Sequence, residues 1–209
     1  ALAAAGVELS QIDLIAGVAP YSSSQAQLIA TDANANSTIL GVTGDYQSVK
    51  NLAVASGSFI SARDDEKYAQ VVVLGATLAE DLYGTDIDPV GQTIRSGNLL
   101  MTVIGVLEEK GTSGPTNVDD AALIPLTTLQ RYLSGSDSIS GISLTVSDES
   151  QMDAAEGFVN DTLLAEHGIT DSTAADFTVT SSADMLETVS TVTGTFTTLL
   201  AAIASISLL

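Results

Sequence analysis

The stretch Gln70-Val-Val-Val-Leu-Gly75, continued by Ala76-Thr-Leu-Ala-Glu-Asp-Leu-Tyr-Gly84, decides the fold class of this chain. The stretch from residue 70 to residue 74, apolar at every position after Gln70, is typical of a strand that is buried on both faces. Apolar side chains then recur at helical spacing between Thr77 and Leu82, and Gly84 supplies a helix stop. A buried strand that leads directly into a helix predicts an α+β fold.

Short elements are predicted on both sides of this stretch. Pro20 and the serines at 22–24 are expected to end the first strand, and Pro125 is expected to open a helix that runs to Leu133. A longer helix should begin near Asp148 or Ser150 and end at Gly168. The other predicted strands cover residues 11–18, 27–31, 38–42, 101–107, 121–124, 142–146 and 177–179, of which 101–107 and 121–124 are expected to be fully buried.

The composition excludes several classes of function. The 209 residues carry 26 acidic side chains against 6 Lys and Arg, a net charge of −20, which disfavours nucleic acid as a partner. The same charge would attract a cationic peptide or a basic protein. Hydrophobic residues make up 45% of the chain and the mean hydropathy is +0.32, which indicates a folded protein. The chain has no cysteine, so disulfides, thiolate metal ligands and a cysteine nucleophile are excluded.

No catalytic, cofactor-binding or metal-binding residue is expected. His167 is the only histidine, stands in the last turn of a predicted helix, and has no Gly-x-Ser-x-Gly motif to accompany it. Asp86–Gly91 resembles a calcium loop, but Val90 offers no side-chain oxygen where one is needed. The carboxylate clusters at 64–66 and 119–120 either hold calcium weakly or are solvated turns, and we favour the turns. Any ATP chemistry must lie outside this chain, because it has no Gly-x-x-x-x-Gly-Lys motif.

The last part of the chain has a helical pattern that continues to its final residue. Met185, Val189, Val192 and Phe196 lie on one stripe, and the segment Leu199–Leu209 carries no charge. A bilayer-spanning helix needs about 20 such residues. The pattern therefore fits either a buried terminal helix or a transmembrane helix cut short by the end of the sequence. We favour the second interpretation, in which the helix connects the outer part of the protein to the membrane and couples their movements.

One loop is expected to contact a partner. It contains glycine, serine, threonine and proline, which cannot pack a core and favour irregular, exposed and mobile backbone. The residues of this partner loop are Gly111, Thr112, Ser113, Gly114, Pro115 and Thr116.

A series of short motifs in a fixed order is similar to a known family. The motifs are Ser56-Gly-Ser-Phe59, Val71-Val-Val-Leu-Gly75, Ala79-Glu-Asp-Leu-Tyr-Gly84, Asp88-Pro-Val-Gly-Gln-Thr-Ile94, Thr102-Val-Ile-Gly-Val-Leu107, Ile124-Pro-Leu-Thr-Thr128 and Asp176-Phe-Thr-Val179, followed by the apolar end. In this order and spacing they resemble the periplasmic core domain of MacB-like and FtsX-like ABC transporter permeases. The resemblance covers nearly the whole chain.

The resemblance implies an α+β fold with two lobes. A porter-like lobe of β-α-β units would come from both chain ends, residues 1–52 and 136–180, and a smaller mixed α/β lobe from residues 53–135 would be inserted into it. Residues 181–209 would form a stalk helix that leads into a truncated transmembrane helix. Shifts in composition near Lys50 and Gly135 agree with these joints.

The resemblance also implies a function in transport. The chain would be a non-catalytic coupling and binding domain on the extracytoplasmic side of the plasma membrane, in a permease that exports peptides, drugs or lipoproteins or transmits mechanical force. Its partners would be a cytoplasmic ABC ATPase, fused or separate, a second permease subunit, and an extracytoplasmic adaptor protein or a cationic peptide. A surface adhesin or structural module, or a hydrolase with an unrecognised site, stays open as an alternative.

Overall fold

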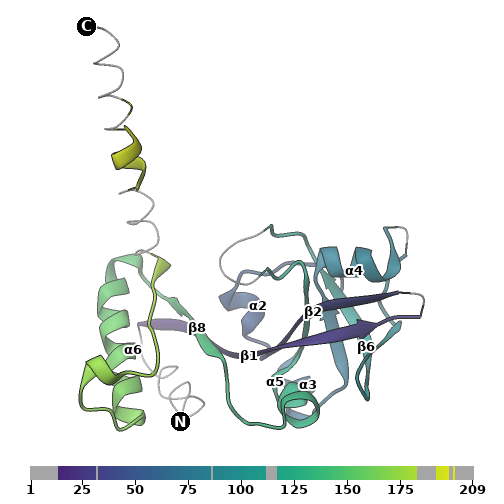
Figure 1. The fold of residues 1–209 in the computed structure, drawn as a ribbon, viewed down its shortest axis with the longest axis horizontal. Helices are drawn as coiled ribbons and strands as arrows, with labels where there is room; N and C mark the ends of the chain where they lie inside the picture. The colour runs from purple at the N-terminus through teal and green to yellow at the C-terminus, as the bar shows by residue number, and fades with distance from the viewer. Residues whose placement is uncertain are drawn as a thin grey trace, which may run out of the picture. The chain divides into compact units, whose positions relative to one another are not determined.

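The computed structural model describes residues 14–31, 33–85, 87–111, 117–182, 192–197 and 200. Contacts divide the chain into two compact units, between Thr145 and Val146. Strands and helices mix along the first unit, which confirms the expected α+β class (Figure 1). The elements are β1 Ile15–Ile29, β2 Asn34–Val42, α2 Tyr46–Val49, β3 Val54–Gly57, α3 Ala62–Glu66, β4 Val71–Leu74, α4 Ala76–Tyr83, β5 Thr93–Ser96, β6 Leu99–Leu107, β7 Ala121–Pro125, α5 Leu126–Leu129, the π-helical turn η1 Gln130–Ser134, β8 Gly141–Val146, the 3-10 turn η2 Glu149–Gln151, α6 Met152–Glu166 and the 3-10 turn η3 Ser172–Ala174.

The eight described strands form one mixed sheet. Its order is β2-β7-β4-β6-β5-β1-β8, with β3 paired to β6. The pairs β2–β7 and β4–β6 are parallel, whereas β1–β2, β1–β5, β3–β6, β4–β7 and β5–β6 are antiparallel. Because β1 pairs with β2 along one edge and with β5 along the other, the sheet closes on itself and these strands leave few unpaired edges.

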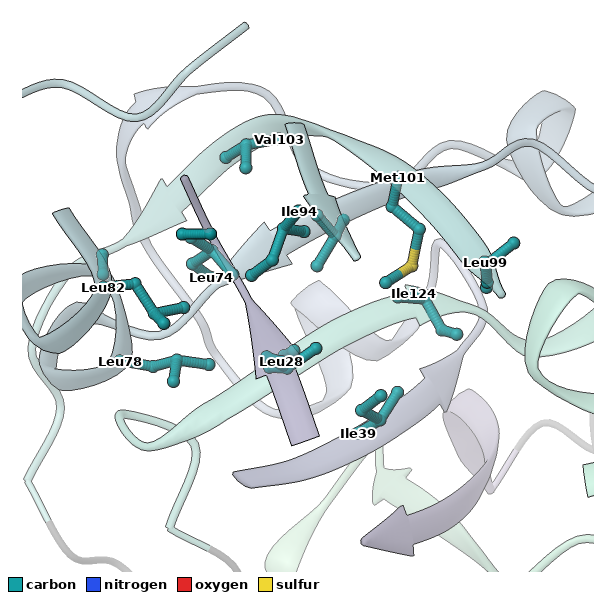
Figure 2. Close-up of a cluster of buried hydrophobic side chains, with 14 of the residues drawn as sticks. Leu28, Ile39, Leu74, Leu78, Leu82, Ile94, Leu99, Met101, Val103 and Ile124 are labelled. Carbon is teal, nitrogen blue, oxygen red and sulfur yellow. The ribbon is translucent and has the colours of Figure 1, made fainter. Parts of the chain in front are cut away.

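Two hydrophobic clusters fill the two faces of this sheet. Strand alternation sends Val72 and Leu74 of β4 into one cluster and Val73 into the other. In the first cluster, side chains of β1, β2, β4, β5, β6 and β7 meet Leu78 and Leu82 of α4 (Figure 2). The second cluster lies around Tyr46 of α2. A strand with an apolar cluster on each face needs a continuous apolar sequence, which is why β4 and β7 have one.

The strand expected at 101–107 is present as part of β6, but the expectation that it is fully buried is wrong. Its odd-numbered residues are buried and its even-numbered residues are partly or well exposed. Leu100 and Thr102 are exposed, whereas Ile104 and Val106 are partly buried against the hydrophobic clusters, so the second face of this strand contributes to the core only in part. An apolar run in the sequence does not distinguish a strand buried on both faces from one that shows leucine and valine to solvent.

The first strand is also longer than expected. β1 passes through Pro20 and the serines at 22–24, where the sequence indicated a break. Its pairing with β2 begins at Tyr21, opposite Val42. Pro20 precedes this pairing, so its missing N–H group removes no hydrogen bond between the two strands. The two strands expected at 11–18 and 27–31 are therefore one element in the described residues.

Local signals in the first unit act as the sequence predicts. The Ser61 side chain accepts a hydrogen bond from the backbone N–H of Asp64, whose carboxylate accepts one from the N–H of Ser61, so α3 begins with a capping box. Gly84 ends α4 with a φ of +80°. Gly75 is required for close packing, because a Cβ there would lie 2.2 Å from the carbonyl oxygen of Val118.

The second unit contains the expected helix at 152–166, preceded by η2. The Asp148 side chain accepts a hydrogen bond from the Ser150 N–H at 2.9 Å and so begins this segment. Ala155, Val159 and Leu163 are the buried residues of α6, one per turn, whereas Phe158 is exposed. The strand expected at 177–179 is wrong, because these residues form no strand, although alternate side chains between 175 and 181 are partly or fully buried.

The lobe boundaries expected at residues 52 and 135 stay a prediction. In the described residues, strands on either side of residue 52 pair with one another, β2 with β7 and β1 with β5. The division between compact units falls later, after Thr145.

Candidate functional site

The base of the partner loop is held by one buried carboxylate. Asp119 is 4% exposed, and its two oxygens accept hydrogen bonds from the backbone N–H of Lys110 at 3.0 Å and of Gly111 at 2.7 Å. Its own N–H donates to the Asn117 side chain at 3.2 Å. Asp119 therefore joins the residues that precede the loop to those that follow it, and its carboxylate is not available to hold calcium.

Of the partner-loop residues, the structure describes Gly111 alone. Gly111 is exposed and has a φ of +76°, a backbone conformation that glycine adopts without strain. Thr112, Ser113, Gly114, Pro115 and Thr116 lie outside the described residues. The contact of this loop with a partner stays a prediction.

Lys110 ties the same base to the end of α2. Its Nζ donates hydrogen bonds to the backbone carbonyl of Lys50 and, at 3.1 Å, to that of Asn51. Carbonyls at a helix C-terminus carry partial negative charge, so a lysine ammonium is favourable there. Burial, and then the neighbouring charge of Lys110, lower the pKa of Lys50.

The carboxylates at 64 and 65 have structural partners as well. Asp64 belongs to the capping box of α3. One oxygen of Asp65 accepts hydrogen bonds from the N–H of Thr127 at 2.9 Å and from its hydroxyl at 3.0 Å, and so connects α3 to α5. The sequence favoured solvated turns for this cluster, whereas Asp64 and Asp65 are partly buried and make helix-end and inter-helix contacts. Within the described ranges, no three His, Asp or Glu side chains gather in a way that could hold a metal ion.

His167 makes contacts within the second unit. Its Nδ1 lies 2.8 Å from a carboxylate oxygen of Asp176, and its ring meets that of Phe177 edge to face at 5.6 Å between centroids. Its Nε2 is buried and has no partner among the described residues. The contact between His167 and Asp176 joins the end of α6 to the segment after it. None of these contacts includes a serine, as a catalytic triad would require.

Two of the four proposed coupling residues lie in described, helical backbone. Val192 is 49% exposed and Phe196 is 61% exposed, four residues apart on one helical stripe. Met185 and Val189 lie outside the described residues, as does the apolar end after Leu200. In the part of the chain that is described, no helix combines the length and apolar character of a membrane span.

The sequence analysis missed one group of residues at the junction of α3 and η1. The Arg131 guanidinium carbon lies 4.8 Å from the centroid of the Tyr68 ring and 5.7 Å from that of Tyr132. Both tyrosines are among the exposed large hydrophobic residues. Tyr68 and Arg131 are far apart in the sequence, so no local pattern indicated this contact.

Comparison with known proteins identifies relatives for most of the chain. Residues 1–161 match the family model described as the MacB-like periplasmic core domain. The macrolide export ATP-binding/permease protein MacB of Azoarcus sp. (strain BH72) is 34% identical over 202 residues, which is 96% of this chain and 30% of that protein. The protein of the same name from Marinobacter nauticus is 41% identical over 157 residues, which is 75% of this chain and 23% of that protein.

Solved structures show the same fold. The periplasmic region of MacB from Actinobacillus actinomycetemcomitans aligns with a TM-score of 0.75 at 23% identity, over 90% of this chain and 82% of that structure. The extracellular domain of the noncanonic ABC-type transporter YknZ from Gram-positive bacteria aligns with a TM-score of 0.68 at 21% identity, over 79% of this chain and 83% of that structure. The chain spans less than a third of the length of either MacB protein named above.

Proposed function

Because the chain belongs to the family of MacB-like periplasmic core domains, the extracytoplasmic domains of ABC transporter permeases, we propose that it couples ATP-driven movement in a longer permease to events outside the membrane. Such a domain is not itself catalytic, and ATP hydrolysis would lie on a nucleotide-binding domain. The family match over residues 1–161 is the observation that carries this proposal. The match names a domain within a transporter and therefore favours coupling over an independent adhesin or hydrolase.

The chemistry of the described residues supports coupling rather than catalysis. Asp119, Asp64 and Asp65 accept hydrogen bonds from backbone groups in the same unit. A carboxylate with such contacts positions chain segments and is poorly placed to transfer protons to a substrate. The domain would therefore act through its shape and its surfaces.

The coupling residues Met185, Val189, Val192 and Phe196 would transmit the movement. Val192 and Phe196 support this role because their side chains are well exposed in helical backbone, so they stabilise little within the described structure. A helix that carries force between two parts of a protein needs continuous backbone hydrogen bonds along its length. The lobes proposed at 1–52 with 136–180 and at 53–135 would be the parts that shift.

The partners would be an ABC ATPase, fused or separate, and a second permease subunit at the plasma membrane. The two MacB relatives named above combine ATP-binding and permease functions in their names, which supports an ATPase partner. An adaptor protein with a basic face, or a cationic peptide, would suit the net charge of −20. The partner loop would be one contact point, because Asp119 holds its base in place. The cargo would be a peptide, a drug or a lipoprotein.

A proline at Val192 tests the coupling role in the full-length permease. Val192→Pro removes one helical hydrogen bond and clashes with the preceding turn, at a cost of about 3 kcal/mol. The variant should reach the membrane and keep its ATPase activity, while export of a reporter substrate or resistance falls to the level of the empty vector. Val192→Ala is the matched control, since alanine shortens the same side chain but favours the helix, and it should export normally.

The result that would contradict the proposal is equally specific. Normal export by Val192→Pro, with loss of local helix shown by hydrogen exchange at 190–197, would mean that this helix does not transmit force. Loss of ATPase activity together with export would indicate damage to the whole transporter, and would also count against a separable coupling element.

A further inference from the structure

The Arg131 guanidinium contacts two exposed tyrosine rings, and we call Tyr68, Arg131 and Tyr132 the arginine clamp. Its guanidinium carbon is 4.8 Å from one ring centroid and 5.7 Å from the other. Tyr68 is 41% exposed, Tyr132 is 45% exposed, and Arg131 is also exposed. The clamp therefore offers a cation and two aromatic faces to solvent at one place.

The clamp is built on a junction that the fold holds firmly. Figure 1 shows α3 and α5 side by side. Thr127 at the start of α5 donates its N–H to Asp65 at 2.9 Å, and the Thr128 hydroxyl donates to the carbonyl of Ala69, also at 2.9 Å. These bonds flank Tyr68 in the sequence, so its backbone is fixed relative to the helix that leads to Arg131.

Both sides of the clamp have uncommon backbone. Tyr68 has a φ of +52°, which a bulky residue rarely adopts. Arg131 and Tyr132 lie in the π-helical turn η1, a type of turn that is frequent at functional sites. Unfavourable backbone persists where the surrounding structure over-determines it, and such residues cluster at ligand clamps and switch regions.

The Arg131 guanidinium forms no ion pair with a described residue. All six Lys and Arg residues lie in the described ranges, yet the one ion pair found there joins His167 to Asp176. Arg131 donates no hydrogen bond to a described residue, whereas Arg95 donates to the carbonyl of Gly97 at 2.9 Å. In a chain with 26 acidic side chains, an arginine without a carboxylate partner is unexpected on charge alone.

The cations near the clamp reinforce it. Arg63 and Lys67 lie on α3 and at its end, four residues apart and so on one helical face, and Lys67 precedes Tyr68. Of the three carboxylates between them, Asp64 and Asp65 accept hydrogen bonds from Ser61 and Thr127, and Glu66 is exposed. Half of the six cations of the chain therefore come from α3, its end and η1.

We propose that the arginine clamp is a docking site for an acidic segment of a partner protein. A guanidinium held against aromatic rings presents a planar fork of N–H groups, which matches a carboxylate through two parallel hydrogen bonds. Arginine and tyrosine are the residue types that most often carry the binding energy of an interface. The clamp goes beyond the coupling function proposed above and does not depend on it.

Charge complementarity selects the acidic segment as the occupant. Elsewhere the net charge of −20 would repel such a segment, so few other surfaces of the chain compete for it. At physiological salt, charges more than about 8 Å away are largely screened, and the contact with the clamp would outweigh the distant repulsion.

Fluorescence anisotropy with a labelled hexaglutamate peptide tests the proposal on the whole chain. Hexaglutamate should bind, and hexaglutamine should not. Arg131→Gln should weaken binding about tenfold, and Arg131→Lys should weaken it nearly as much because lysine keeps the charge but lacks the planar fork. Arg95→Gln is the matched control, because it removes one exposed cation from β5 and changes the net charge equally, and it should bind as the unchanged chain does.

Three results would overturn the proposal. Binding of hexaglutamate no better than that of hexaglutamine would contradict it. Equal weakening by Arg95→Gln and Arg131→Gln would indicate a general charge effect. Binding of phosphatidylglycerol vesicles through Arg131, without binding of the peptide, would assign the clamp to a membrane surface instead. Arg131→Lys keeps the test decisive if Arg131→Gln is poorly folded, as judged by circular dichroism.

Discussion

The two units of this chain are built on different principles. In the first unit, β2, β4 and β7 lie between two hydrophobic clusters, and many of their side chains are completely buried. In the second, α6 buries one residue per turn, Ala155, Val159 and Leu163, and leaves Phe158 exposed. The first unit is therefore stabilised by packing across the sheet, and the second depends more on local contacts at the ends of its helix.

This difference suits a coupling domain. A unit with a doubly covered sheet resists deformation, because close-packed interiors transmit strain rather than absorb it. A unit held by a few caps and short contacts can open locally at low cost in free energy. Variants in the two units should therefore behave differently, and tyrosine fluorescence separates them. All five tyrosines lie before Thr145, so tyrosine fluorescence reports on the first unit alone.

The largest effect should follow removal of a core side chain from the first unit. Leu74→Ala leaves a cavity between β4 and α4, and should lower the free energy of unfolding by about 2–5 kcal/mol. Leu163→Ala in α6 is the matched change in the second unit. Urea unfolding should show that Leu74→Ala shifts the tyrosine transition and that Leu163→Ala leaves it unchanged. Equal shifts from both variants would mean that the two units unfold together.

A smaller effect is expected at the base of the partner loop. Asp119→Ala leaves the N–H groups of Lys110 and Gly111 without their acceptor and should cost about 1–3 kcal/mol. Asp119→Asn keeps one acceptor oxygen and should cost less. Limited proteolysis should cut the alanine variant faster between residues 110 and 118, and unchanged cleavage would contradict a role for Asp119 in holding the loop.

Alkaline pH should destabilise the first unit through Tyr46. Burial, and then the neighbouring Tyr21, raise the pKa of Tyr46 to about 12. The folded state therefore favours the protonated phenol, so this contribution to stability is complete below pH 10 and is lost as the pH rises toward 12. Tyr46→Phe should remove the dependence, which amounts to no more than about 3 kcal/mol. Unfolding at pH 8 and pH 11, followed by circular dichroism, checks this, with Tyr132→Phe as the exposed control.

The smallest effect should be acid-dependent and confined to the second unit. Hydrogen bonds from the hydroxyl and then the N–H of Ser150 lower the pKa of Asp148. Its stabilisation is therefore present above the ordinary aspartate range and is lost as the pH falls through the lowered value. Asp148→Asn should reduce the helical signal at 222 nm at neutral pH and flatten its acid dependence. Asp171→Asn, which removes the same type of contact to Thr173, should leave the signal of α6 unchanged.

Much of the local structure could be predicted from residue patterns. Residues close together in the sequence predict β4 followed by α4, β7 followed by a turn at Pro125, and α6 ending at Gly168. All of these elements are present. Such signals act within one or two helical turns, so they can be seen without knowledge of the fold. The role of the partner loop stays a prediction from its composition, and the contacts of Asp119 at its base could not be read from that composition.

Several features that could not be predicted from the sequence depend on segments that meet from far along the chain. Whether β6 is covered on one face or two depends on which elements pack against it, and β1 continues past Pro20 because β2 pairs with it only afterwards. The clamp requires Asp65 to meet Thr127, 62 residues away. Residue patterns specify local conformation because their interactions are short in range. The surfaces and buried contacts arise from packing, which places side chains together only after the sheet has closed.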